Sequence, residues 1–554
     1  MNVVKRSGLW EPFRPQDWVV EEIALTRDTG YWIDREINLQ EGFAWRGGHD
    51  EGTFTYSWFP FYLLTGNRRI MAFLEKLKQD CLHWMRRTGS MLHGYWKDSD
   101  VHHGTELFTN FLAQYLRFGR DRDVIRAFVD VAHHAGNWVE GVPDWYDWER
   151  KRFRSERLGT QRVDCETPSN VPAHFRMVQI LLETYLATGD ERYLKLGREY
   201  VDEWSAVILD RDVVPFYLDD PEEREIRGQR RSVEYIVEEH VANNTINILM
   251  DLYIITGEKR YIKSVKKMLN PILTRVSDPN NNASSTILAK YRALAGDRSL
   301  DQKVVESLKV ANEEFEAALM ILDSEWRRKP HPLGIGRRRD EPQWAFRRRD
   351  GSIVEDRWSS PAHLMLAFWI TGDTDLAAQA FWKAKLRLRL AMWNLRSGRW
   401  HGCAAGSVSS VVAGHGRCLG AGNVTATLYP AVFGGYQFLG GFLPQLIYYR
   451  ENDVLGVPEG VAALFSPTRR ENEAKVLFYN CNETPIKMGI ELTSGRWDDV
   501  TPEFENIKKL RISGSKVTVL LPPRELGGIR YVLPSRWAIQ TLVRGRVLGY
   551  LCPR

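Results

Sequence analysis

The sequence has little excess charge of either sign. It contains 76 lysines and arginines against 71 aspartates and glutamates among 554 residues, so its formal net charge is only +5. A chain that binds nucleic acid usually carries a much stronger basic signature. A weak preference for anionic ligands is the most that this balance supports, and we expect no nucleic-acid partner.

Cysteines with the spacing of a metal or redox site are also missing. The six cysteines stand far apart, and no two of them form a Cys-x-x-Cys pair. Neither a zinc knuckle nor a disulfide framework is therefore expected. We interpret them as reduced cysteines of a cytoplasmic protein, and we predict neither a metal nor a cofactor.

No long apolar run suggests a signal peptide or a membrane span. The N-terminal segment has no apolar core of signal-peptide length. The most apolar stretch, residues 428–449, is interrupted by Pro430, Gln437, four glycines and Pro444. We interpret this stretch as a buried helix with its approaches, and we expect no membrane partner.

What the sequence does have is a repeated pattern of two helices joined at a glycine. Residues 184–201, TYLATGDERYLKLGREYV, show it clearly. The glycine can take the left-handed conformation that ends a helix, and the polar residue after it can cap the next helix. The pattern predicts six helical hairpins, whose turn glycines are Gly66, Gly119, Gly189, Gly257, Gly296 and Gly372.

These hairpins predict the architecture of most of the chain. One hairpin cannot bury its apolar stripe alone, so hairpins must pack side by side. We expect a mainly α fold, an (α/α)6 toroid of six helical hairpins, with an open helical array as the alternative. After about residue 455 short alternating runs, such as the predicted hairpin at 512–517, indicate antiparallel strands. The predicted parts are an N-terminal extension (1–40), the toroid catalytic domain (41–452) and a small β-sandwich-like domain (453–554).

Acidic and histidine side chains gather where the first helix of a hairpin begins. The stretch KDSDVHHGTELF (97–108) is the densest, and segments 49–52, 163–166 and 238–240 repeat the pattern. In a ring these helix starts would meet at one end and form a polar funnel. Asp, Asn and Ser also cap helices without any function. Histidine is not a cap, however, and a helix N-terminus disfavours its cationic form, so we predict an active site there.

Three motifs resemble a known superfamily over roughly residues 41–450. The turn TGD-x-x-Y at 188–193 is typical of the six-hairpin glycosidases, and HDEG at 49–52 resembles their unsaturated uronyl hydrolases. The sequence departs from those enzymes by placing two histidines in DVHHGTE (100–106), which resembles the β-glucuronidase-like family 154 of glycoside hydrolases. The resemblance implies a toroid with a sugar-binding cleft and hydrolysis of a uronic-acid-containing glycan, with release of terminal β-glucuronic acid.

Glycoside cleavage needs one carboxylic acid and one carboxylate whose pKa values are held apart. The predicted catalytic residues are Asp50, Asp100, His102, Glu106, Glu166 and Glu239. Arginine suits a sugar carboxylate, and aromatic rings cover pyranose faces; Arg162 and Arg176 also lie near these loops. The predicted substrate-binding residues are Arg46, His49, Glu51, Trp96, His103, Asp164, His240, Asn244, Arg357 and Trp358.

Other functions stay open at this point. A polysaccharide lyase on the same ring would use a histidine or Tyr56 as the base, with Asn243 and Asn244 beside the uronate. A non-catalytic glycan-binding or scaffold protein and a sugar epimerase or isomerase are further alternatives. In each case the expected partner is an acidic oligosaccharide or polysaccharide, which the basic segment 326–349 could attract. The sequence does not decide the oligomeric state.

Overall fold

The computed structural model describes residues 68–118, 121–160, 170–219, 225–321, 343–383 and 447–532, with further short gaps inside some of these ranges. The predicted N-terminal extension and the first turn glycine, Gly66, lie outside the described residues, as does Gly119. The described part is mainly helical, with small antiparallel sheets. This confirms the prediction of a mainly α fold with antiparallel sheets.

The helices follow one another along the chain, with long connections between α6 and α7, between α8 and α9 and between α13 and α14. They are α3 (Arg68–Arg87), α4 (Val101–Glu106), the π-helical segment η2 (Leu107–Leu112), α5 (Ala113–Phe118), α6 (Arg122–Ala135), α7 (His174–Thr188), α8 (Glu191–Asp210), α9 (Val233–Ala242), α10 (Thr245–Thr256), α11 (Lys259–Thr274), α12 (Asn282–Ala295), α13 (Asp301–Glu306) and α14 (Pro361–Thr371).

Four of the six predicted turn glycines are described, and all four adopt the left-handed conformation. Their φ angles are 77° at Gly189, 78° at Gly257, 64° at Gly296 and 73° at Gly372. At the first of these the glycine N–H donates to the carbonyl oxygen of Tyr185 at 2.7 Å, which closes α7 before α8 begins. The prediction of glycine-ended helices is confirmed at these four positions.

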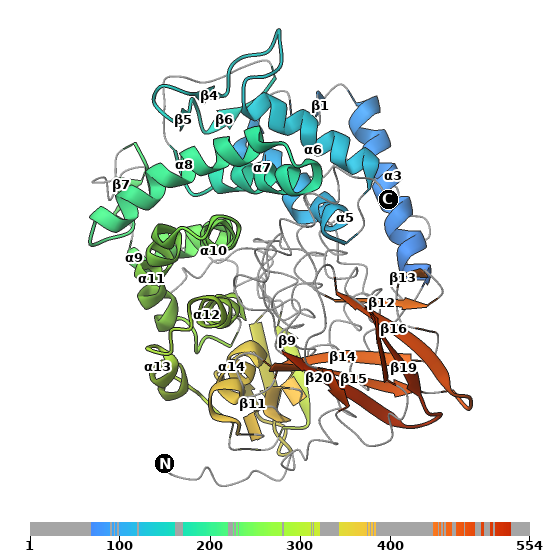
Figure 1. Ribbon diagram of the computed structural model, residues 1–554. Coiled ribbons are helices and arrows are strands. Elements are labelled where there is room, and N and C mark those ends of the chain that lie inside the picture. Colours follow the sequence, from blue (N-terminus) through green and yellow to red (C-terminus); the bar gives the residue numbers. More distant parts are fainter. Residues whose placement is uncertain are drawn as a thin grey trace.

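The helices form two layers. Every residue of α7 from His174 to Ala187 is buried, and so is every residue of α10 from Thr245 to Ile255. A helix that is buried all round lies inside a structure. In contrast, α8 and α11 bury only one stripe. The inner helices α4, α7, α10, α12 and α14 pack on one another in that order, and α6, α8 and α11 pack against their outer side (Figure 1).

This two-layered arc agrees with stacked hairpins. Its closure into a ring would depend on residues 1–67 and 384–446, which lie outside the described residues. The toroid is therefore not confirmed. Among the described residues, no helix is long and apolar enough to cross a membrane.

Antiparallel sheets make up the C-terminal part. A five-stranded sheet has the order β13-β12-β16-β19-β18 and a four-stranded sheet the order β14-β15-β20-β17. Ser513 pairs with Lys516 across the predicted hairpin. The strands are β12 (Ile447–Glu451), β13 (Val454–Leu455), β14 (Val461–Pro467), β15 (Glu473–Asn480), β16 (Ile486–Leu492), β17 (Val500–Pro502), β18 (Leu510–Ser513), β19 (Lys516–Leu521) and β20 (Leu526–Val532).

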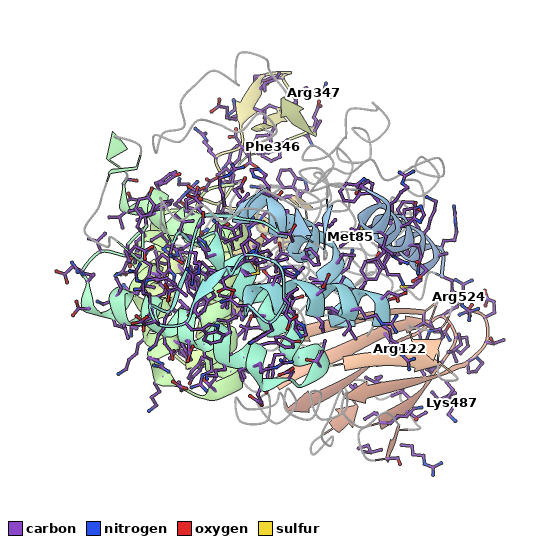
Figure 2. All side chains as sticks on the ribbon, turned by 90° about the horizontal axis from the view of Figure 1, so that it is seen from above. Met85, Arg122, Phe346, Arg347, Lys487 and Arg524 are labelled. Atoms are coloured by element: carbon purple, nitrogen blue, oxygen red, sulfur yellow. The ribbon has the colours of Figure 1, made fainter. Side chains whose placement is uncertain are left out.

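A three-stranded sheet between α13 and α14 was not expected from the sequence. It consists of β9 (Ala317–Ile321), β10 (Gln343–Arg347) and β11 (Ile353–Glu355). Phe346 of β10 packs with Phe315 and Trp358 in a small core separate from the main one. Figure 2 shows Phe346 and Arg347 at this small sheet. The remaining described strands are two-residue pairs: β1 (Met91–Leu92), β2 (Tyr95–Trp96), β3 (Ser99–Asp100), β4 (Tyr146–Asp147), β5 (Arg152–Phe153), β6 (Arg157–Leu158), β7 (Glu225–Ile226) and β8 (Gln229–Arg230).

Candidate functional site

The start of α4 holds a carboxylate in a defined position. Asp100 is the N-cap of α4, with the extended backbone (φ −68°, ψ 153°) that a cap requires, and its Oδ1 accepts the backbone N–H of His103 at 2.9 Å. One strand pairing also fixes the residue, because Asp100 lies opposite Arg157 in β3 and β6. The cap satisfies one of the N–H groups that the helix start leaves without a partner.

Asp100 and His103 form a dyad. The second carboxylate oxygen of Asp100, Oδ2, lies 2.7 Å from Nδ1 of His103. Burial alone would raise the pKa of Asp100, but the hydrogen bonds from His103 hold that pKa well below its usual range. The same hydrogen bond raises the pKa of His103 above 6.5. The His103 side chain is 52% exposed and that of Asp100 is 35% exposed, so this dyad lies at the surface of the site.

A second histidine–carboxylate pair lies behind the dyad. Nε2 of His102 is 3.1 Å from Oε1 of Glu106, one helical turn further along the chain. The same oxygen lies 3.5 Å from a terminal guanidinium nitrogen of Arg176. The side chains of Glu106 and Arg176 are only 4% and 2% exposed. Burial, and next the positive charge of Arg176, lower the pKa of His102, while Glu106 opposes that shift.

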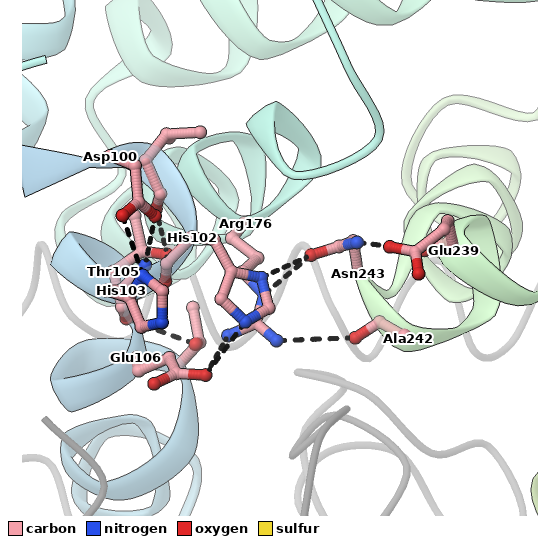
Figure 3. A network of polar contacts seen from close by, with 11 residues as sticks. Asp100, His102, His103, Thr105, Glu106, Arg176, Glu239, Ala242 and Asn243 are labelled. Carbon is pink, nitrogen blue, oxygen red and sulfur yellow. Dashed lines mark hydrogen bonds and ion pairs between the residues drawn. The ribbon is translucent and has the colours of Figure 1, made fainter. Parts of the chain in front are cut away.

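The break between α9 and α10 adds an amide to this cluster. Asn243 accepts a hydrogen bond at Oδ1 from Nε of Arg176 at 2.9 Å, and the same oxygen lies 3.2 Å from Nδ1 of His102. Its Nδ2 donates to the backbone carbonyl of Glu239 at 2.9 Å. Figure 3 shows Arg176 lying between Glu106 and Asn243. Three separate elements, α4, α7 and the α9–α10 break, therefore meet at one place.

A buried polar chain continues from this point into the inner helices. Asn244 has φ of 65°, which is left-handed backbone, and its Nδ2 donates to Oε1 of Gln179 at 3.2 Å. The chain ends at an ion pair between Lys290 and Asp251, 2.6 Å apart and fully buried. Its members are Glu183, Gln179, Asn244, Asn247, Lys290 and Asp251.

Sequence reasoning did not select the deeper members of this chain. The signal was present, because Gln179 and Glu183 interrupt the apolar run of α7 four residues apart. Asn247 and Asp251 interrupt α10 with the same spacing. Residues four apart share one face of a helix, so both pairs mark a polar stripe inside an apolar helix.

The structure brings together four of the predicted site residues, namely Asp100, His102, His103 and Glu106, and adds Arg176 and Asn243 to them. Glu239 joins through its backbone carbonyl. Their roles in catalysis and substrate binding stay predictions.

Other predicted residues have different surroundings. His240 is fully buried between Thr245 and the carbonyl of Pro215, and burial lowers its pKa to about 4. Arg357 is exposed, with Glu313 and the ring of Trp358 as neighbours, and Trp358 belongs to the small core at β10. Each therefore has a structural explanation. Trp96 belongs to β2, but its side chain is not described.

The remaining predicted residues lie outside the described residues: Asp50, Glu166, Arg46, His49, Glu51 and Asp164. Among the residues that the structure does describe, no group of three or more His, Cys, Asp or Glu side chains is arranged to hold a metal ion.

Comparison with known families gives one match. The model of an FAD binding domain matches residues 84–240, which is less than half of the chain. No curated protein matches the sequence. Two solved structures are weakly similar: a polysaccharide lyase (12% identity, TM-score 0.34, 68% of this chain and 97% of the other) and a GH127 β-L-arabinofuranosidase from Geobacillus stearothermophilus T6 (10% identity, TM-score 0.27, 93% and 80%). TM-scores this low carry no argument about fold or activity.

The family match corrects the interpretation drawn from sequence motifs. The predicted six-hairpin glycosidase membership is contradicted, because the matching model describes a flavin-binding domain. The same match also contradicts the predicted β-glucuronidase-like glycoside hydrolase activity and its lyase and glycan-binding alternatives. The physical reason is that TGD-x-x-Y describes how a helix ends and the next begins, and DVHHGTE contains a helix cap. Such features recur wherever helices are joined and do not specify a reaction.

The described residues of 84–240 do not fit an FAD in the usual way. A dinucleotide is normally held by a parallel β-α-β unit with a Gly-x-Gly-x-x-Gly turn, its pyrophosphate at a helix N-terminus. The strand pairs described here are antiparallel and two residues long, and no two glycines in this range are separated by one residue. The starts of α4, α6 and α8 are capped by aspartates, whose negative charge would repel a phosphate.

Proposed function

We propose that this chain is an enzyme in which Asp100 and His103 transfer a proton to or from a small polar substrate. The carrying observation is the 2.7 Å contact between Oδ2 of Asp100 and Nδ1 of His103 at the surface of the site. An ionised carboxylate beside Nδ1 keeps the proton on that nitrogen and fixes the orientation of the ring. The exchange of a proton with the substrate is then assigned to Nε2.

The protonation behaviour of His103 supports this role. A general acid or base works best when its pKa lies near the working pH. Asp100 raises the pKa of His103 from 6.5, and histidine is the side chain whose charge ordinarily changes nearest to neutral pH. Capping alone accounts for the contact from Oδ1 to the backbone, but it does not account for the second contact, from Oδ2 to the ring.

The substrate class is part of the proposal. We keep an acidic oligosaccharide or polysaccharide as the proposed class, and the net charge of +5 is compatible with it through a weak preference for anionic ligands. Arg176 is buried and already contacts Glu106 and Asn243. We therefore assign the attraction of an anionic group to the imidazolium form of His103 instead of to this guanidinium.

Proton transfer can be tested before the substrate is known. Purified protein is incubated in D2O with a panel of sugar acids, hydroxy acids and keto sugars, and incorporation of deuterium at carbon is followed by NMR. We expect exchange in at least one compound, and a loss of about 10²- to 10⁴-fold in His103→Gln.

The matched control for this assay is His83→Gln, because His83 is an exposed histidine on α3. It should exchange at the wild-type rate. Wild-type exchange in His103→Gln would contradict the proposed role of the dyad, and so would the absence of any turnover by the wild type across the panel.

A flavin-dependent oxidoreductase is the second candidate. The observation that favours it is the family match over residues 84–240, a range that includes the dyad. The test is the visible absorption of the protein after incubation with FAD and gel filtration, combined with reduction of a redox dye by the same panel. Stoichiometric flavin with dye reduction would support this candidate, and a colourless, inactive protein would refute it.

Two further predictions stay proposals beside this one. The two-layered arc supports a ring closed by the first and last hairpins of residues 41–452. The scattered cysteines support a cytoplasmic location. Location of a tagged chain in fractionated cells tests the latter.

A further inference from the structure

The amide of Asn243 has a defined orientation. Nε of arginine can only donate a hydrogen bond, so the Asn243 atom 2.9 Å from Nε of Arg176 must be the oxygen. The other end agrees with this assignment, because Nδ2 of Asn243 donates to the carbonyl oxygen of Glu239. Neither contact would survive an exchange of the amide nitrogen and oxygen.

This orientation determines which nitrogen of His102 carries a proton. Nδ1 of His102 lies 3.2 Å from the same Asn243 oxygen, which can only accept. Nδ1 must therefore be an N–H. A neutral imidazole has only one N–H, so in the neutral ring Nε2 is without a proton.

Nε2 in turn faces a carboxylate oxygen, Oε1 of Glu106, at 3.1 Å. Two acceptors at this distance would repel each other, so a proton must lie between them. Either His102 is an imidazolium beside a carboxylate, or it is neutral beside a carboxylic acid. The two arrangements have the same number of protons and the same net charge, and the pair titrates as a unit.

We propose that Asn243 is a positioning residue that keeps a proton on Nδ1 of His102, so that a single further proton is shared between Nε2 of His102 and the Glu106 carboxylate. Arg176 at 3.5 Å favours the carboxylate form of Glu106. The ring of His103 lies nearby and meets that of His102 edge-on, with the ring centroids 5.1 Å apart. When His103 is charged, it disfavours the imidazolium form of His102. A charged His103 also attracts the Glu106 carboxylate, so its two effects on the shared proton oppose each other.

The groups that act on this pair come from three elements. On the α4 side they are Asp100 and His103, on α7 the guanidinium of Arg176, and on α9 and its end the Asn243 amide and the carbonyl of Ala242. This inference refines the site of the proposed function, since it describes the charge behind the dyad. Its test needs no substrate, so the inference and the proposed function can fail separately.

The test is the protonation state of the His102 nitrogens. Protein labelled with ¹⁵N-histidine is studied by long-range ¹H–¹⁵N correlation, and the His102 signals are identified by their loss in His102→Gln. We expect Nδ1 to carry a proton in the wild type across the neutral pH range. In Asn243→Ala no acceptor holds the Nδ1 proton, so Nδ1 should release it to solvent, while the shared proton stays on Nε2 and donates to the Glu106 carboxylate.

Two further variants keep the test decisive. Asn243→Asp retains an acceptor of the same shape and should retain the Nδ1 proton, which covers the case that the alanine variant does not fold. Asn244→Gly suits the left-handed backbone at that position and should leave the His102 signals unchanged. An unprotonated Nδ1 in the wild type, or unchanged His102 signals in a folded Asn243→Ala, would overturn the inference.

Discussion

Replacing Asp100 separates its two contributions to the structure. Asn at this position keeps an oxygen that can cap α4, but it loses the charge that holds His103. The two side chains are 35% and 52% exposed, so solvent screens the ion pair. Such exposed pairs contribute about 0.2–1 kcal/mol. Asp100→Asn should therefore lower the free energy of unfolding by less than about 1 kcal/mol, and Asp100→Ala by roughly 1 kcal/mol more through loss of the cap.

The effect of Asp100→Asn should depend on pH in a definite direction. The pKa of His103 is raised in the folded state, so its stabilisation is complete below the unfolded pKa of 6.5 and is lost as pH rises through the raised value. The pKa of Asp100 is lowered, so its stabilisation is complete above the unfolded pKa of 3.8 and is lost as pH falls toward the lowered value. The pair stabilises the fold most between these two unfolded pKa values.

Urea unfolding of the wild type and Asp100→Asn, followed by circular dichroism, measures this difference. We expect a larger loss at about pH 5.5 than at about pH 8.5, since ordinary histidine and aspartate pKa values bracket the first pH and not the second. The difference between the unfolding free energies of the two proteins at each pH cancels the contribution of every other titrating group that the substitution leaves unchanged. An equal loss at both pH values, or a larger loss at the higher pH, would refute the assignment of the dyad as an ion pair.

Three further results are expected from the buried parts of the fold. Lys290→Met leaves the fully buried Asp251 without its cation and should lower the free energy of unfolding in urea by about 3–5 kcal/mol. The control Lys266→Met, at an exposed pair, should lower it by under about 1 kcal/mol. Equal losses of stability in the two variants would contradict the argument. Gly257→Ala places a Cβ at φ 78° and should cost about 1–2 kcal/mol, so an unchanged midpoint in urea would count against the left-handed turn. The pKa of His240 falls from 6.5 to about 4 on folding, so as pH falls the unfolded state binds this proton before the folded state does. The free energy of unfolding should therefore drop by up to about 1.4 kcal/mol per pH unit as pH falls between those values. If His240→Asn left this dependence of stability on pH unchanged, the prediction would be wrong.

The helical hairpins could be predicted from local residue patterns alone. A left-handed glycine followed by a capping residue needs only adjacent side chains, which is why Gly189, Gly257, Gly296 and Gly372 all behave as expected. The gathering of acids and histidines at the start of α4 was equally local. The caps and the pairs within this segment, Asp100 with His103 and His102 with Glu106, follow from spacings of three and four residues on one helix.

The other parts of the fold and of the site depend on contacts between segments that are distant in the sequence. Arg176 and Asn243 lie far from α4 in sequence, and only the packing of α7 and the α9–α10 break brings them to Glu106 and His102. The three-stranded sheet at β10 also joins strands from either side of a long connection.

The predicted activity was wrong because turn and cap motifs describe how helices begin and end, and they carry no information about the reaction.

The most direct test of the account is the pH dependence of kcat/KM for the first substrate found in the exchange panel, compared between wild type and Asp100→Asn. The account predicts an ionisation that coincides with the pKa of His103 measured by NMR, moves to lower pH when Asp100 becomes Asn, and disappears together with most of the activity in His103→Gln. A wild-type rate and profile in His103→Gln would contradict it.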